Sequence, residues 1–364
     1  MTLQKEFKLL ISVKQISFKK ISGYLIPVIL TLLFLYLALR GIDLQESFEI
    51  IFNVSVIWLV VYILVFIFSH FIRAIRWKLM ISQVKKDVSL TNLFGAVMIG
   101  YGVNCVIPRL GEVYRGFFLG KWEGVSRTTM LGTVIVERII DISAFAFASL
   151  LSVYLFPGNL FDKIVWLKTS LIIGFSIIFI LAVVVIFLVR FEAKFDSAIV
   201  KIVGKFSKKA SETLSDIFST LVSGFSIIDG SKSIFYIVTL TMFILILYAL
   251  NAYVGFYMLD MQINGNVNLV MAWVFMTISA YGMIIPTPGG TGSYHMISIL
   301  VLTQVYSFNY ELSAAYAILT HFISYVIFIG STLGFVYVIN RIRIKKGYSS
   351  ENFYSVFSLR NDSK

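Results

Sequence analysis

Long apolar runs separated by short polar segments recur along the whole chain. A helix needs about 20 residues to cross the hydrocarbon core of a bilayer, and several runs reach that length. The pattern therefore predicts an all-α polytopic membrane protein rather than a soluble enzyme. Six runs are expected to be full spans: 22–40, 54–72, 128–156, 166–190, 234–258 and 312–340.

The distribution of basic residues predicts how these spans are oriented. Lysines precede the first run, acidic residues follow it, and the second run ends in a basic segment that includes Arg73 and Arg76. Loops rich in Lys and Arg stay on the cytoplasmic side, so we interpret that segment as cytoplasmic. The last run also ends in a basic segment, from Arg341 to Lys346. Both termini are therefore expected in the cytoplasm.

Two apolar stretches are flanked on both sides by segments assigned to the same face of the membrane. They are 89–127, with cytoplasmic flanks, and 264–308, with flanks on the outer face. Each is interrupted by Gly and Pro, which break helices. We predict two oppositely oriented, broken or re-entrant helical hairpins, one in each half, which is typical of inverted-repeat transporters. Full crossing by each hairpin segment, giving ten spans, remains the alternative.

This interpretation divides the chain into five parts. The two membrane halves are joined by a Lys-rich loop with apolar residues at helical spacing, which we expect to lie along the cytoplasmic interface. The parts are a basic N-terminus (1–21), a first half (22–190), the interfacial loop (191–232), a second half (233–341) and a tail (342–364).

The composition agrees with a membrane protein and excludes several kinds of functional site. Only 14% of residues are charged and 58% are hydrophobic, whereas soluble domains have about a quarter charged residues. The net charge of +12 comes from segments that flank apolar runs, so no nucleic-acid partner is expected. Cys105 is the single cysteine, which excludes a disulfide within the chain and a multi-cysteine metal site. We expect no cofactor and no metal.

The break in the first hairpin carries the first candidate site. Arg109 stands at the break, and Glu112 and Arg115 share one face of the helix expected to follow. Ionisable residues at membrane depth are costly and mark functional positions, and a guanidinium beside a helix start suits a phosphate. A cytoplasmic loop with a local ion pair would explain the same residues. Asn104, four residues before Pro108, belongs to this motif.

The second candidate site lies within the run 128–156. Glu137 and Asp141 are four residues apart on one helical face, and Arg138 can reach Asp141. These carboxylates could neutralise Arg109 and Arg115 until an anionic substrate displaces them. A permanent buried ion network that only orients the helices is the alternative.

The break in the second hairpin, 286–292, carries the third candidate site. Gly289, Gly290 and Gly292 could let backbone N–H groups converge on an anion in a half that lacks Lys and Arg, although a simple sharp turn would use the same residues. His295 follows on the next helix and could contact a headgroup or relay protons. The same applies to His321, and a histidine bonded to a neighbouring carbonyl is the plainer interpretation of both.

In this order and spacing, the three motifs resemble the lysylphosphatidylglycerol synthase transmembrane-region family of flippase-like membrane proteins, over about residues 20–342. The matching residues are Asn104, Pro108, Arg109, Gly111, Glu112 and Arg115; Glu137, Arg138 and Asp141; and Pro286, Pro288, Gly289, Gly290 and Gly292. The family often has Glu where this chain has His295, so a coupling role of that carboxylate is not carried over. Members fused to an aminoacyl-transferase domain make and translocate aminoacylated phosphatidylglycerol.

The sequence up to Lys364 contains no such transferase domain, so the resemblance implies translocation more than synthesis. We expect a multi-pass protein of the cytoplasmic membrane that moves an anionic, phosphate-bearing lipid between leaflets, either a modified phospholipid or a polyprenyl-phosphate carrier. A membrane subunit of a glycosyl- or aminoacyl-transfer enzyme is the alternative, and a purely structural membrane protein is the third. A homo-oligomer or a partner enzyme is compatible with each.

Overall fold

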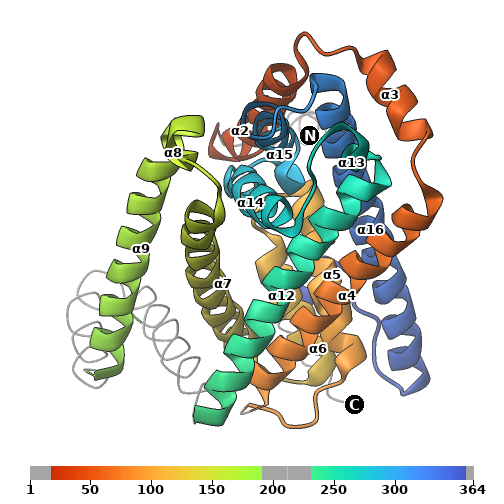
Figure 1. Ribbon diagram of the computed structural model, residues 1–364. Helices are drawn as coiled ribbons and strands as arrows, with labels where there is room; N and C mark the ends of the chain where they lie inside the picture. Colours follow the sequence, from red (N-terminus) through yellow and green to blue (C-terminus); the bar gives the residue numbers. More distant parts are fainter. Residues whose placement is uncertain (1–17, 83, 191–210, 212–230, 358–364) are drawn as a thin grey trace, which may run out of the picture.

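The computed structural model describes residues 18–82, 84–190, 211 and 231–357, and within these residues it contains helices and no strands. The predicted all-α class is therefore confirmed. The N-terminal segment up to residue 17 and nearly all of the predicted interfacial loop lie outside the described residues. Figure 1 shows the helices gathered into one bundle, with α9 at its edge.

Most helices coincide with the apolar runs. The first half contains α2 (Phe18–Leu39), α3 (Leu44–Phe52), α4 (Val56–Ile81), α5 (Leu90–Val106), α6 (Gly111–Glu123), α7 (Arg127–Leu155), α8 (Leu160–Lys163) and α9 (Val165–Arg190). The second half contains α12 (Ser231–Met258), α13 (Met261–Asn264), α14 (Leu269–Ser279), α15 (Ser293–Leu300) and α16 (Tyr310–Lys345). Short 3₁₀ turns, η1 (Ala280–Ile284) and η2 (Pro288–Gly290), join α14 to α15; a π-helical turn, η3 (Val301–Val305), follows, and η4 (Ser355–Phe357) lies in the tail.

Three described helices are long and apolar enough to cross a membrane, namely α4, α12 and α16. A fourth span results if α2 and α3, which meet at 88°, are counted together. The helix α7 has 29 residues but carries charges in its interior, as a helix facing a polar site does. The six-span count and the cytoplasmic location of both termini stay predictions.

The end of the second span is a correction to the sequence analysis. The helix α4 continues to Ile81, so Arg73 and Arg76 lie within it and are buried, instead of flanking it in the cytoplasm. No Gly or Pro occurs between residues 73 and 81 to stop the helix. The positive-inside rule misplaced these arginines because acidic partners on α7 accommodate them inside the bundle.

The first hairpin is formed by α5 and α6, whose outer ends meet at Glu123. The carboxylate of Glu123 lies 2.7 Å from Lys85 Nζ and accepts from Asn92 Nδ2 at 2.7 Å and Ser89 N at 3.1 Å. At about 1.5 Å per residue, the two helices carry the chain about 20–26 Å from this base and back. Near the tip the backbones touch, because any side chain on Gly111 would collide with the Gly100 carbonyl.

The second hairpin runs from α14 and η1 through η2 to α15 and η3. Its two arms also touch at a glycine, since a Cβ on Gly282 would lie 2.7 Å from the Ser293 carbonyl oxygen. Figure 1 shows α14 and α15 in the upper part of the bundle and α6 in the lower part. The tips meet between them: the hydroxyl of Tyr325 on α16 donates to Pro288 O at 2.6 Å and also lies 3.2 Å from Cys105 O.

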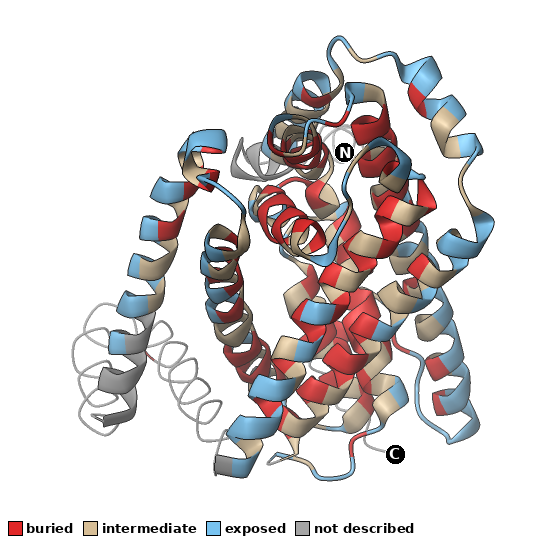
Figure 2. Cartoon of the chain, in the orientation of Figure 1, coloured by how far each residue is buried: buried red, intermediate tan, exposed pale blue. Residues whose placement is uncertain are grey.

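The centre of the bundle is the most densely buried part of the chain. Figure 2 shows buried residues concentrated where α4, α5, α7 and α12 approach one another, whereas α9 exposes most of its surface. The tail after α16 folds back onto α6, where Tyr114 donates from its hydroxyl to Phe353 O at 3.1 Å. Val356 of the tail is fully buried in the same apolar cluster as Trp77 and Phe118.

Candidate functional site

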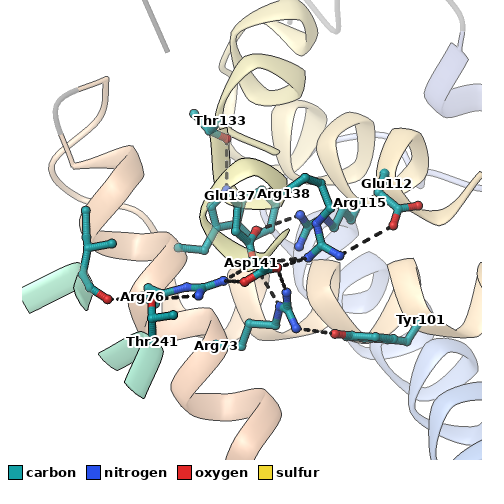
Figure 3. A network of polar contacts seen from close by, with 12 residues as sticks. Arg73, Arg76, Tyr101, Glu112, Arg115, Thr133, Glu137, Arg138, Asp141 and Thr241 are labelled. Carbon is teal, nitrogen blue, oxygen red and sulfur yellow. Dashed lines mark hydrogen bonds and ion pairs between the residues drawn. The ribbon is translucent and has the colours of Figure 1, made fainter. Parts of the chain in front are cut away.

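A network of charged side chains lies inside the bundle, and α4, α6 and α7 supply its members (Figure 3). Residues three and four apart share a helical face, which brings Arg73 and Arg76 together on α4. The same spacing places Glu137 and Asp141 on the facing side of α7, with Arg138 beside them. Arg115 comes from the second arm of the first hairpin. The network thus joins the hairpin to two long helices.

Glu137 is the centre of this network and is 0% exposed. One carboxylate oxygen, Oε1, accepts from Arg73 Nε and Arg76 Nη2, each at 2.9 Å. The other, Oε2, lies 2.7 Å from Arg115 Nη2, and Arg138 Nη2 is 3.6 Å from Oε1. A buried carboxylate is stable only when its charge is compensated, and here four guanidinium groups compensate it.

Asp141, one turn further along α7, contacts three of the same arginines. It accepts from Arg76 Nη2 at 2.6 Å and lies 2.8 Å from Arg138 Nη2, the pair that the sequence predicts. Arg73 Nη2 also donates to it. Asp141 differs from Glu137 in exposure, because 23% of its side chain is accessible.

Neutral groups complete the surroundings of the arginines on α4. Arg73 Nη1 donates to the hydroxyls of Tyr101 on α5, at 2.7 Å, and Tyr248 on α12, at 3.0 Å. Arg76 Nη1 donates to Thr241 Oγ1 at 3.0 Å. Five helices therefore contribute to one polar centre in an otherwise apolar bundle.

The network has more positive than negative charge. Its four guanidinium groups face Glu137 and Asp141, and the only other carboxylate in contact among the described residues, Glu112, lies 3.9 Å from Arg138. One positive charge is left over. In addition, the Nε–H groups of Arg76, Arg115 and Arg138 have no hydrogen-bond partner among the described residues. Buried donors without acceptors are costly, so an acceptor close to these groups would be favourable.

Exposure across the network is graded. The side chains of Arg76 and Glu137 are closed off from the surface, whereas Arg138 is 33% accessible and Glu112 is 26% accessible. With Asp141, these two form an open edge of the network. A ligand would therefore reach the arginines from this edge.

The first motif does not act as one unit in the structure. Asn104 joins the two arms of the hairpin: its Oδ1 accepts from Gly111 N at 2.8 Å and its Nδ2 donates to Glu112 at 3.3 Å. Arg115 enters the network, but Arg109 points away from it and donates from Nη2 to Ile284 O at 2.7 Å. Substrate binding by these residues stays a prediction.

The glycine-rich break is closed by its own hydrogen bonds. The N–H groups of Gly290 and Thr291 donate to Thr287 O and Pro288 O, at 3.1 and 2.9 Å, and Gly292 N donates to His295 Nδ1 at 3.3 Å. Gly289, Gly290 and Gly292 all have positive φ values, which glycine adopts without strain. An anion would have to displace these internal bonds, so the expected anion nest also stays a prediction.

The two histidines contact each other beside this loop, with ring centres 4.6 Å apart. His321 Nε2 lies 3.1 Å from Gly289 O, and because a carbonyl only accepts, Nε2 carries the proton. His295 accepts at Nδ1 from Gly292, as described above, and is buried. Both therefore support the loop through hydrogen bonds to its backbone in this structure.

Sequence reasoning missed several members of the network: Arg73, Arg76, Tyr101 and Tyr248. A signal was present for two of them. Arg73, Arg76 and Trp77 recur at helical spacing on one face of α4, and Arg115 stacks over the Trp77 ring at 4.9 Å. The tyrosines carried no such signal, because 16% of the chain is aromatic. Among the described residues, no group of three or more His, Cys, Asp or Glu could hold a metal ion.

Comparison with known proteins places the chain in a family. It is 22% identical over 317 residues to a UPF0104 membrane protein of Methanocaldococcus jannaschii, covering 85% of this chain and 92% of that protein. A UPF0104 membrane protein of Methanothermobacter thermautotrophicus is 26% identical over 286 residues, covering 73% and 81%. No solved structure matches. The model of the lysylphosphatidylglycerol synthase transmembrane region matches residues 24–331, and the chain is an integral membrane protein that belongs to this family.

Proposed function

We propose that this protein translocates an anionic, phosphate-bearing lipid between the leaflets of the membrane in which it resides. The observation that carries the proposal is the leftover positive charge of the buried network, which is accessible from one edge. A cationic site at membrane depth is costly unless an anion completes it. The anion that meets such a site inside a membrane is the headgroup of a lipid.

The donor set favours phosphate over other anions. Guanidinium groups bind tetrahedral oxyanions through paired N–H donors, and several arginines here are held within reach of one point. The open edge offers the N–H donors of Arg138, which lies in the same network as the three enclosed arginines. A phosphate can accept from more than one N–H group of a guanidinium at once.

Asp141 is the exchangeable partner in this proposal. It is the carboxylate of the network that combines contacts to Arg73, Arg76 and Arg138 with partial exposure. An incoming phosphate would take over some of these contacts, whereas enclosed Glu137 keeps the arginines in place. Rocking of one half against the other about the meeting hairpin tips would then present the headgroup to the opposite face.

Translocation of fluorescent phosphatidylglycerol in reconstituted vesicles, followed by quenching of the outer leaflet, tests the proposal. Arg138→Gln removes a cation at the open edge, where folding tolerates it, and should slow translocation at least tenfold. The matched control is Arg40→Gln, because Arg40 is exposed at the end of α2 and lies outside the network. Thermal unfolding of both variants checks that each is folded. Equal translocation by wild type and Arg138→Gln would reject the proposal.

A further inference from the structure

The tip of the first hairpin exposes a cation among apolar side chains. Arg109 is exposed, and so are Val106, at 67%, and Ile284, at 53%, with Met283 beside it. Two of these residues come from the first hairpin and two from the second. The patch therefore forms where the two hairpin tips meet, as the bond from Arg109 to Ile284 O shows.

The position of this patch makes the exposed charge unusual. With the basic base of the hairpin at the membrane surface, as the sequence predicts, the tip lies about 20 Å deep in a hydrocarbon core about 30 Å thick. A charged side chain in lipid at that depth is costly. Arg109 is therefore retained where it meets water or an anion, since hydrocarbon alone would not accommodate it.

Arg109 also has N–H donors that form no hydrogen bond within the described residues. A guanidinium has five N–H donors, and one hydrogen bond from Arg109, to Ile284 O, is formed within the described chain. No carboxylate among the described residues pairs with it. Its backbone adopts a left-handed conformation, with φ at 66°, which is unfavourable for a non-glycine residue. Such strain is typical of functional positions.

We propose that Arg109, Val106, Met283 and Ile284 form a second binding site, which holds the phosphate of an anionic lipid on the guanidinium and its first acyl methylenes on the apolar side chains. This inference rests on the proposed function for its class of ligand. Glu112 lies between this tip site and the buried network, three residues after Arg109 and 3.9 Å from Arg138. The lipid headgroup thus has two binding sites, one at the hairpin tip and one at the open edge of the network.

The apolar half of the site decides between a lipid and free phosphate. Inorganic phosphate can contact the guanidinium but makes no contact with Val106, Met283 and Ile284. The acyl chain of a lipid can pack against these three side chains while its phosphate stays on Arg109. The tip site therefore takes an amphiphile in preference to its headgroup alone.

Native mass spectrometry of the full chain in neutral detergent, with dioctanoyl phosphatidate as the probe, counts the sites. Wild type should bind two molecules. Arg109→Gln should lose one of them, with at least tenfold weaker binding, and Arg138→Gln should weaken the other. Arg40→Gln is the matched control and should still bind two. Glycerol 3-phosphate, which has the headgroup without the chains, should not occupy the tip site.

Each other outcome is decisive. If Arg109→Gln binds the lipid as wild type does, the tip site is overturned. If wild type binds a single molecule and only Arg138→Gln removes it, the tip site is also overturned, but the proposed function stands. A single molecule that only Arg109→Gln removes supports the tip site and rejects the network as a binding site. Glycerol 3-phosphate binding as tightly as phosphatidate overturns the lipid claim. No binding by wild type rejects the proposed function itself.

Discussion

The two hairpins of this protein share a backbone arrangement and differ in chemistry. Each has two short arms in contact at a glycine, Gly111 in the first and Gly282 in the second, and their tips meet at Tyr325. Around the first hairpin lie the arginines and carboxylates of the network. The second is held by neutral groups: Ser293 Oγ donates to Gly282 O at 2.7 Å and lies 2.9 Å from Thr287 Oγ1. From residue 233 to 340 the chain contains no Lys or Arg.

This difference separates the residues that build a hairpin from the residues that give it charge. Closely packed glycines and neutral hydrogen bonds suffice to build a hairpin inside a membrane, because they satisfy the backbone hydrogen-bonding groups without burying an uncompensated charge. Charges are therefore not needed for the hairpin fold, and those around the first hairpin require another explanation. The leftover positive charge and the open edge fit the anionic lipid proposed above, which is the explanation that we propose for them.

The largest effect on stability is expected at the centre of the charged half. Glu137→Gln leaves four arginines around a neutral amide, and removal of one partner from a buried ion pair costs about 3–5 kcal/mol. Thermal unfolding in detergent measures the change. The matched control is Glu46→Gln on the exposed face of α3, which should leave the unfolding temperature unchanged. Equal unfolding temperatures for Glu137→Gln and wild type would contradict the network described here.

The next largest loss of stability should follow when a side chain is added at the two glycine contacts, and the loss should be similar in the two hairpins. Gly111→Ala and Gly282→Ala each force apart backbones that touch, and overpacking of this kind costs about 1–3 kcal/mol. Gly334→Ala on α16, where a Cβ meets nothing within 4 Å, is the control. Unfolding temperatures should fall for the first two variants only. A loss confined to one hairpin would show that the two are not built alike.

The neutral connection between the tips should contribute less. Tyr325→Phe removes the hydroxyl that bonds Cys105 O and Pro288 O, and such hydrogen bonds contribute about 0.5–1.5 kcal/mol each. The variant should unfold at a slightly lower temperature, and Tyr337→Phe, on an exposed part of α16, should not. A loss as large as that of Glu137→Gln would place the main stabilising contact at the tips instead of the network.

The smallest effect is expected where a charge lies near the surface. Lys85 pairs with Glu123 at the base of the first hairpin, and its side chain is 36% accessible. Exposed pairs contribute about 0–1 kcal/mol, and salt screens them. Lys85→Met should therefore lower the unfolding temperature little, and less still in 1 M salt. A drop comparable to that of Glu137→Gln would mean that charge itself, and not its burial, sets the stability of this half.

Much of the fold could be predicted from the sequence, because apolar runs and helix breakers act locally. The run 128–156 became α7, and 89–127 became the α5–α6 pair with its break near Pro108. The pairing of Arg138 with Asp141 followed from spacing within one helix. Predictions that depend on residues close in sequence were therefore the reliable ones.

The composition of the site could not be predicted in full. Arg73 has the same sequence context as an orienting arginine, at the end of an apolar run, and only the packing of α4 against α7 shows that it is buried. Tyr248 is 175 residues away from Arg73 along the chain. Arg109 was grouped with Arg115 by proximity in sequence, but Arg115 contacts Glu137 in the network, whereas Arg109 donates to Ile284 O in the second hairpin.

The lipid that remains bound when the protein is purified gives the most direct test of the central claim. Mass spectrometry of the extracted lipids should show an anionic, phosphate-bearing species enriched over the composition of the source membrane. Arg73→Gln, which weakens the network without touching the surface, should lose that enrichment. A lipid composition equal to that of the source membrane, or enrichment of a lipid without net negative charge, would contradict the account.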